Sequence, residues 1–238
     1  MSQIFQNAKL EDHGVILEYQ LPLTSRRLDC MICGKDERKS DNAVIVELKQ
    51  WDKCESSDCE NEVITWVGGA KREILHPSVQ VGQYQKYLED THTAFYEGDS
   101  PVRLSSCSYL HNYNFEEDDI VFAPKFKETL KNYPLFTGDH TFELQDYLVN
   151  RLKGGGGTEV LKRIEESKYR PSKKLMDHVG RLIKGKPEYV LLDEQLVVFD
   201  RVLCTARNGF HNRQKSMILI KGGPGTGKSV IAINLMAD

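Results

Sequence analysis

The chain has 238 residues, of which 39% are hydrophobic and 28% are charged, and its formal net charge at pH 7 is −3. This length and composition allow one or two folded domains and exclude disordered and collagen-like chains. No run approaches the roughly 18 apolar residues of a membrane helix, and the N-terminus lacks a secretory signal, so we expect a cytoplasmic protein with no membrane partner.

The charge is divided unevenly along the chain. Residues 1–150 carry 15 Lys and Arg against 26 Asp and Glu, a net charge of −11, whereas residues 151–238 carry 17 against 9, a net charge of +8. Such asymmetry predicts units with different roles. We predict one domain over 1–150, a helical linker over 151–187 and part of a second domain over 188–238. Four glycines, 154–157, mark the expected joint because they carry no packing side chain.

The hydrophobic pattern predicts an α/β fold. Three strands are expected over 14–21, 27–33 and 43–49, because these runs are rich in apolar and β-branched residues and are separated by turn residues. Pro77 lies near the first turn of a predicted helix over 77–90. Further strands are expected over 105–112, 120–123 and 216–220, and further helices over 158–167, 172–182 and 188–207.

Six cysteines are expected to be reduced, because no export signal is present. The spacings Cys30-x-x-Cys33 and Cys54-x4-Cys59 resemble those of zinc ligands. Residues three apart on a strand point to opposite faces, however, which is poor geometry for chelation by the first pair. We therefore favour ordinary buried or half-buried thiols over a zinc site.

One predicted strand carries an acidic and a basic residue two positions apart. Glu47 and Lys49 share a face of the strand, and Asp29 lies beside Glu47 if the strands form a hairpin. Two carboxylates suit Mg²⁺ or Mn²⁺, which would polarise a scissile phosphate and activate a bound water. Lys49 could position that water or stabilise the transition state. A surface Glu–Lys pair is the alternative, but the apolar neighbours indicate a strand buried on both faces.

Two polar residues of the following helix complete a family pattern. Gln80 and Tyr84 are four apart and share one helical face. The order Asp29, Glu47-x-Lys49 and Gln80-x-x-x-Tyr84 resembles the PD-(D/E)xK nucleases of the RecB-like branch. The resemblance implies a restriction-endonuclease-like mixed sheet flanked by helices and metal-dependent phosphodiester hydrolysis. Asp29 and Glu47 would be metal ligands, Lys49 the catalytic lysine, and Gln80 and Tyr84 an auxiliary pair.

A phosphate-binding loop follows near the C-terminus. The segment 222–229, GGPGTGKS, matches G-x-x-x-x-G-K-[ST] in full, between an apolar run and a helix start. Backbone N–H groups and the helix N-terminus of such a loop bind phosphates, which predicts ATP as a cofactor. Lys228 would reach the β- and γ-phosphates and Ser229 would ligate Mg²⁺. The expected nucleotide-binding residues here are Gly222, Gly223, Gly225, Thr226, Gly227, Lys228 and Ser229.

Gln195, followed by an apolar run, resembles the Q-motif of superfamily 1 helicases, in which a Gln reads the adenine edge. The whole arrangement resembles the Schlafen group 3-like DNA/RNA helicases, in which a nuclease-like domain precedes a P-loop helicase core. No Walker B acid follows the loop, and phosphoryl transfer needs one. We therefore expect a truncated P-loop domain, with a first strand, a loop and a helix, and no helicase activity in this chain.

These patterns predict a metal-dependent nuclease that acts on nucleic acid, with DNA favoured over RNA. In the intact protein it would be coupled to an ATP-dependent helicase or translocase. The acidic N-terminal half keeps a non-catalytic nucleic-acid-binding module open. A regulatory P-loop ATPase with an N-terminal sensor domain is the third interpretation.

Overall fold

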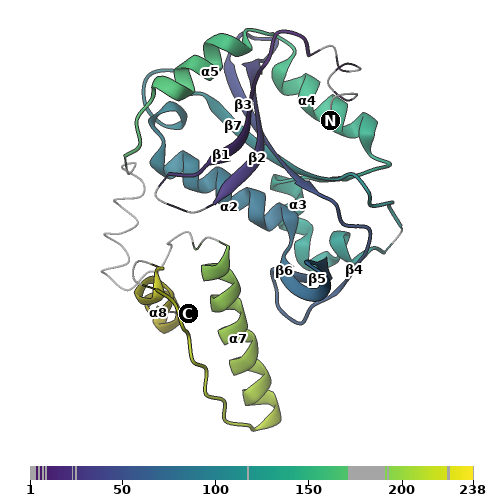
Figure 1. Ribbon diagram of the computed structural model, residues 1–238, viewed down its shortest axis with the longest axis vertical. Helices are drawn as coiled ribbons and strands as arrows, with labels where there is room; N and C mark the ends of the chain where they lie inside the picture. Colours follow the sequence, from purple (N-terminus) through teal and green to yellow (C-terminus); the bar gives the residue numbers. More distant parts are fainter. Residues whose placement is uncertain are drawn as a thin grey trace.

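The computed structural model describes residues 10–22, 24, 26–116, 118–170, 191, 193–223 and 226–237, together with residues 4, 6 and 8. The helix predicted over 172–182 lies outside these residues. The described chain is mixed α/β, with an open five-stranded sheet between helices and a smaller three-stranded sheet (Figure 1).

The main sheet contains the three strands predicted near the N-terminus. Its order is β1-β2-β3-β7-β8, in which β1, β2 and β3 are antiparallel neighbours and β7 and β8 add in parallel. The three predicted strands and the one expected over 105–112 are confirmed to within about two residues. The bounds are β1 Gly14–Gln20, β2 Arg27–Lys35, β3 Asp41–Lys49, β7 Arg103–Leu110 and β8 Leu135–Thr137.

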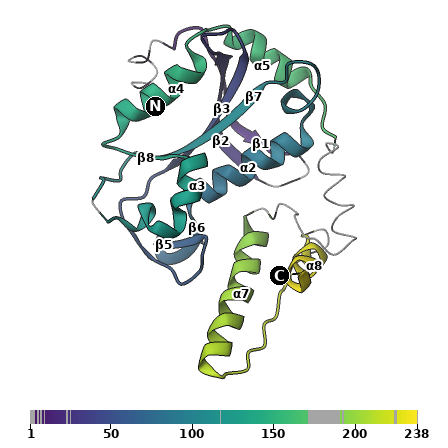
Figure 2. The ribbon, with the colours of Figure 1, turned by 180° about the vertical axis from the view of Figure 1, so that it is seen from behind.

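Helices cover both faces of this sheet (Figures 1 and 2). On one face, α2 (Pro77–Thr91) and α5 (Gly157–Glu166) pack over Ile45 of β3. On the other face, α4 (Thr141–Leu152) packs over Val44 and Val46. The central strand β3 is therefore buried on both sides, as its apolar run predicts, and any charged residue on it is held in the interior.

A second, antiparallel sheet was not predicted. It comprises β4 (Cys54–Ser56), β5 (Glu62–Val67) and β6 (Ala70–Leu75) in that order. A two-residue turn at Gly68 and Gly69 joins β5 to β6, and both glycines have positive φ, which such tight hairpins require. We call these three strands the β4–β6 sheet.

Short helices flank β7, one before it and three between β7 and β8 of the main sheet. The segment 120–123, predicted as a strand, instead forms a 3-10 turn in which the Asp119 carboxylate accepts a hydrogen bond from the Val121 N–H, so this prediction is wrong. The side-chain cap offers the backbone a local alternative to strand pairing. The connecting elements are η1 Thr93–Phe95, η2 Ile120–Phe122, η3 Pro124–Phe126 and α3 Lys127–Asn132.

The four consecutive glycines are bound to the main sheet instead of forming a free joint. Gly154 donates a backbone hydrogen bond to Lys35, which in turn donates one to Gly155, and Gly157 donates one to Asp12. Gly155 and Gly156 have positive φ, so the tetrad makes a tight turn from α4 into α5. The core of the main sheet consequently continues past residue 150 into α5.

The C-terminal part contains α7 (Glu194–Asn212) and α8 (Lys228–Ala237). Helix α7 confirms most of the helix expected over 188–207. The strand predicted over 216–220 is wrong: the segment is not in a ladder with any described strand, and Met217 is 97% exposed. A single run cannot pair its own N–H and C=O groups, so apolar composition alone does not make it a strand. Among the described residues, no helix is long and apolar enough to cross a bilayer.

Candidate active site

The β2–β3 hairpin brings the first three predicted site residues together. The antiparallel register pairs Cys30 with Val46, which sets Asp29 across from Glu47. The Asp29 carboxylate accepts a 2.7 Å hydrogen bond from the Leu48 N–H, and Lys49 Nζ lies 2.7 Å from Glu47 Oε1. The expected side-by-side placement follows from strand pairing alone.

Glu47 is the most deeply buried of these charged groups, with 2% of its surface exposed. Burial raises the pKa of Glu47 from 4.5 to about 7, the Lys49 ammonium opposes that rise, and the Asp29 and Asp193 carboxylates add to it. Glu47 Oε2 has no hydrogen-bond partner among the described residues. A buried carboxylate with a free oxygen is stabilised when a cation approaches it.

Helix α2 places Gln80 and Tyr84 over the face of the sheet to which Glu47 and Lys49 belong. Gln80 Nε2 donates a 2.8 Å hydrogen bond to the Tyr84 hydroxyl, which confirms that the two side chains share one helical face. The buried Tyr84 hydroxyl in turn donates a 3.1 Å hydrogen bond to Asp193 Oδ2. The pair thus connects the sheet to a carboxylate that the sequence pattern did not select.

Asp193 is the residue that sequence reasoning missed. It precedes α7, has a positive φ of 39° and is 6% exposed. Its carboxylate lies 2.9 Å from Arg26 Nε, and its backbone N–H donates a 2.9 Å hydrogen bond to Gln83 Oε1. A residue other than glycine stays in this backbone region only when its surroundings hold it there. A buried acid before a helix is a weak sequence signal, since Asp is also an ordinary N-cap residue.

Three oxygen atoms near this point have no partner within the described part of the chain: Glu47 Oε2, Asp193 Oδ1 and Ser108 Oγ. Ser108 belongs to β7, and the parallel register sets it directly beside Glu47. Buried polar atoms in proteins almost always have partners, so a group of exceptions needs an explanation. Oxygen donors of this kind fit a hard divalent cation such as Mg²⁺.

The carboxylates here are spaced more widely than in a closed metal cage. In the described residues, the only group of His, Cys, Asp and Glu whose ligand atoms all lie within 4.8 Å of one another is Cys59, Glu62 and Glu73. Mg²⁺ is usually bound through one or two carboxylates and keeps several waters. Asp29, Glu47 and Asp193 therefore suit a partly hydrated ion, which leaves room for a phosphate oxygen.

The predicted nucleotide-binding loop lies at the start of α8. Lys228 Nζ donates hydrogen bonds of 2.8 Å and 2.6 Å to the carbonyls of Gly222 and Gly223, and Gly227 has a φ of 81°. Ser229 is exposed in the first turn of α8. The predicted residue Gly225 lies outside the described residues.

Gln195 contacts this loop. Its Nε2 donates a 3.2 Å hydrogen bond to the Thr226 carbonyl. Gln195 is only two residues from Asp193, which bonds to Tyr84 in the other site. The first turn of α7 therefore touches both groups of predicted site residues.

The structure places the members of each of the two cysteine pairs in different surroundings. Cys30 and Cys33 belong to the cores on opposite faces of the main sheet, as the strand geometry predicts. Cys54, the first residue of β4, packs against the hydrophobic cluster that includes Val63, whereas Cys59 lies with Glu62 and Glu73. All six cysteines are free thiols.

Comparison of the chain with protein-family models found no match, and searches of the curated proteins and of the solved structures found none either. A functional assignment therefore depends on the geometry of the site.

Proposed function

We propose that the chain is a metal-dependent phosphodiester hydrolase with a restriction-endonuclease-like main sheet. One observation carries the proposal: Asp29, Glu47 and Lys49 converge on one end of the β2–β3 hairpin, and the buried Glu47 keeps one oxygen free. An acid pair with a lysine at this spacing is suited to binding a cation and stabilising charge on a phosphate.

Each residue then has a distinct role. Asp29, Glu47 and Asp193 would hold Mg²⁺ or Mn²⁺, which when bound polarises the phosphate and lowers the pKa of a water. The Lys49 ammonium, held 2.7 Å from Glu47 Oε1, would stabilise negative charge on the phosphate oxygens. Tyr84, fixed by Gln80, would position the Asp193 carboxylate.

The substrate we propose is nucleic acid, with DNA as the first choice. The proposal also includes ATP as a ligand of the loop at 222–229, with its phosphates on Lys228 and its base near Gln195. Support for this part comes from the complete loop motif and from the contact of Gln195 with Thr226. We propose further that nucleotide binding at this loop drives a helicase or translocase activity linked to the nuclease.

The test is cleavage of single-stranded, nicked and supercoiled DNA by the purified chain with Mg²⁺ or Mn²⁺. We expect Glu47→Ala and Lys49→Ala each to lower the rate by at least about 100-fold, because each removes charge stabilisation at the reacting phosphate. Glu55 and Lys71 provide a matched control, since they form an exposed Glu–Lys pair on the β4–β6 sheet. Glu55→Ala and Lys71→Ala should cleave at the wild-type rate.

The outcomes separate the three interpretations. Equal cleavage by Glu47→Ala and wild type would reject this site. DNA binding without cleavage, unchanged by chelators, would favour the non-catalytic module. Nucleotide binding with no effect on DNA would favour the regulatory ATPase. Circular dichroism of the isosteric Glu47→Gln variant checks that a loss of activity is not a loss of fold.

A further inference from the structure

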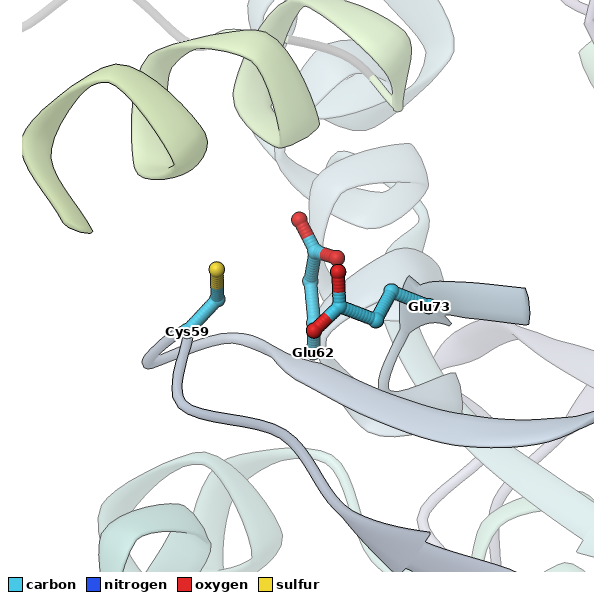
Figure 3. A group of neighbouring side chains, drawn as sticks. All are labelled: Cys59, Glu62 and Glu73. Carbon is cyan, nitrogen blue, oxygen red and sulfur yellow. The ribbon is translucent and has the colours of Figure 1, made fainter. Parts of the chain in front are cut away.

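A second cluster of ligand-type side chains lies away from the candidate active site, between the β4–β6 sheet and α7. It comprises Cys59, Glu62 and Glu73, whose ligand atoms all lie within 4.8 Å of one another. Figure 3 shows the Cys59 sulfur and the two carboxylates gathered below α7. The residues come from the β4–β5 loop, from β5 and from β6, so the antiparallel ladder fixes their relative positions.

Glu62 provides an independent reason to expect a ligand here. Its side chain is fully buried, and within the described chain its Oε1 has no hydrogen-bond partner. Burial raises the pKa of this carboxyl, and the Arg201 guanidinium opposes the rise. A fully buried carboxylate with a free oxygen costs stability unless something approaches that oxygen.

The charges already present around the cluster are balanced, so a dication that arrives with two thiolates would leave the net charge unchanged. Arg201 Nη2 lies 3.4 Å from Glu62 Oε2 and 3.7 Å from Glu73 Oε2, both long contacts. Its 3.2 Å hydrogen bond to the Glu73 carbonyl holds it in place independently of the carboxylates. Lys125 Nζ donates to the carbonyls of Ser57, Cys59 and Glu62. These two cations offset the two glutamates, and a dication bound by two thiolates would add no net charge.

The fourth ligand comes from α7. Cys204 is close enough to Cys59 that its thiol, after burial, raises the pKa of Cys59. Cys204 lies three residues after Arg201, so both side chains project from neighbouring turns of α7 toward the β4–β6 sheet.

We propose that Cys59, Glu62, Glu73 and Cys204 form a Zn²⁺ site. Zn²⁺ accepts both thiolate and carboxylate ligands and prefers four of them in a tetrahedron, whereas Mg²⁺ selects oxygen alone. Ligand atoms around tetrahedral zinc are about 3.5 Å apart, so the atoms of Cys59, Glu62 and Glu73 need to contract by about 1 Å. The Cys204 sulfur lies outside this 4.8 Å group and has to approach by rotation of its side chain. The ion would tie the β4–β6 sheet to α7, as structural zinc sites tie separate segments together.

The test is titration of the metal-free, reduced chain with Zn²⁺ against a chromophoric chelator, and with Co²⁺ as a spectroscopic probe. Co²⁺ bound by thiolates gives a sulfur-to-metal charge-transfer band, which the Asp29, Glu47 and Asp193 site cannot produce because it holds no cysteine. We expect one thiolate-bound ion per chain, counted from the charge-transfer band in wild type, whatever amount of metal binds at the Glu47 site. Loss of a direct ligand in Cys59→Ser or Glu73→Gln should weaken binding more than about 100-fold, the upper range for a supporting residue.

Matched variants make the result specific. Cys54→Ser changes a half-buried thiol of the same sheet outside the cluster and should bind like wild type. Glu73 is partly exposed, so Glu73→Gln tests the site without emptying the core. Cys204→Ser also removes a direct ligand, so it should weaken binding more than about 100-fold and reduce the charge-transfer band.

Several results would overturn the proposal. No charge-transfer band in wild type would reject the site, as would equal loss in Cys54→Ser and Cys59→Ser. An unchanged band in Cys204→Ser would remove Cys204 from the ligand set. A thiol count two below six before reduction, with no metal binding after reduction, would make Cys59 and Cys204 a redox pair instead of ligands.

Discussion

Burial and neighbouring acids oppose ionisation of Glu47. The protonation of Glu47 therefore affects the free energy of unfolding, which can be measured. The carboxyl is buried beside two other acids, and one ammonium partly compensates it. Its pKa in the folded chain, about 7, lies above the ordinary value of 4.5. The native state therefore binds more protons than the unfolded state between these two values.

Stability should consequently fall as the pH rises from 4.5 to 7. The contribution of Glu47 is fully present below pH 4.5 and is lost as the pH rises through the folded pKa, a change of about 3 kcal/mol. Glu62, Asp193 and Asp200 also have raised pKa values and act in the same direction. The difference between wild type and Glu47→Gln in urea unfolding isolates Glu47. A difference that does not vary with pH would contradict this account.

At this scale, the sequence was sufficient for residues whose placement follows from strand pairing or helix periodicity. Asp29, Glu47 and Lys49 meet because their strands pair in a hairpin, and Gln80 and Tyr84 meet because they lie one helical turn apart. Asp193 could not be predicted, because its contact with Tyr84 joins residues 109 positions apart through tertiary packing. Cys59 was considered with Cys54, whereas its actual neighbours come from β5, β6 and α7.

The turn from α4 into α5 depends on the absence of a side chain at Gly157. A Cβ at this position would lie 2.0 Å from the backbone nitrogen of Gly14, which cannot turn away as a side chain can. Helix α5 buries Val160 and Ile164 against β1 and β2, so separating it from β1 opens the core.

Gly157→Ala should therefore lower the free energy of unfolding by about 1–3 kcal/mol or more, the usual cost of overpacking. Thr158→Ala is the control, because Thr158 is the next residue of α5 and its side chain is exposed. Urea denaturation of both variants measures the difference. If the two variants have equal stability, α5 is not held as closely as this contact requires.

The predicted elements were right where the sequence carries a clear local signal. Strands β2 and β3 are continuous apolar runs, and α2 begins at a proline, so both types were recognisable. The β4–β6 sheet escaped prediction because β4 is three residues long and β6 is mostly polar. The apolar run at 216–220 was predicted as a strand but does not form one, since no described strand pairs with it.

On the scale of the whole molecule, α7 is attached to the rest of the chain mainly by polar contacts. Among its residues whose burial is described, only Asp200 is buried, and Phe210 is 86% exposed. Asp200 accepts a 2.9 Å hydrogen bond from Asn61, and Arg201 reaches Glu62. The main sheet, by contrast, is held by two apolar cores.

Salt should therefore release α7 while the main sheet stays intact. At about 1 M NaCl the Debye length is about 3 Å, so exposed ion pairs lose most of their attraction, whereas apolar burial does not weaken. Hydrogen exchange of the metal-free chain should show faster exchange in α7 at high salt and no change in β3. Unchanged protection of α7 would mean that apolar packing holds it.

The first turn of α7 has a consequence for communication within the molecule. Asp193 contacts Tyr84 and Arg26, and Gln195, two residues on, contacts Thr226 of the loop at 222–229. A helical turn is stiff, so a displacement of this turn moves both side chains together. A ligand that reorients Gln195 would alter cation affinity at Glu47, and a cation there would alter affinity for that ligand by the same factor, because such coupling is reciprocal.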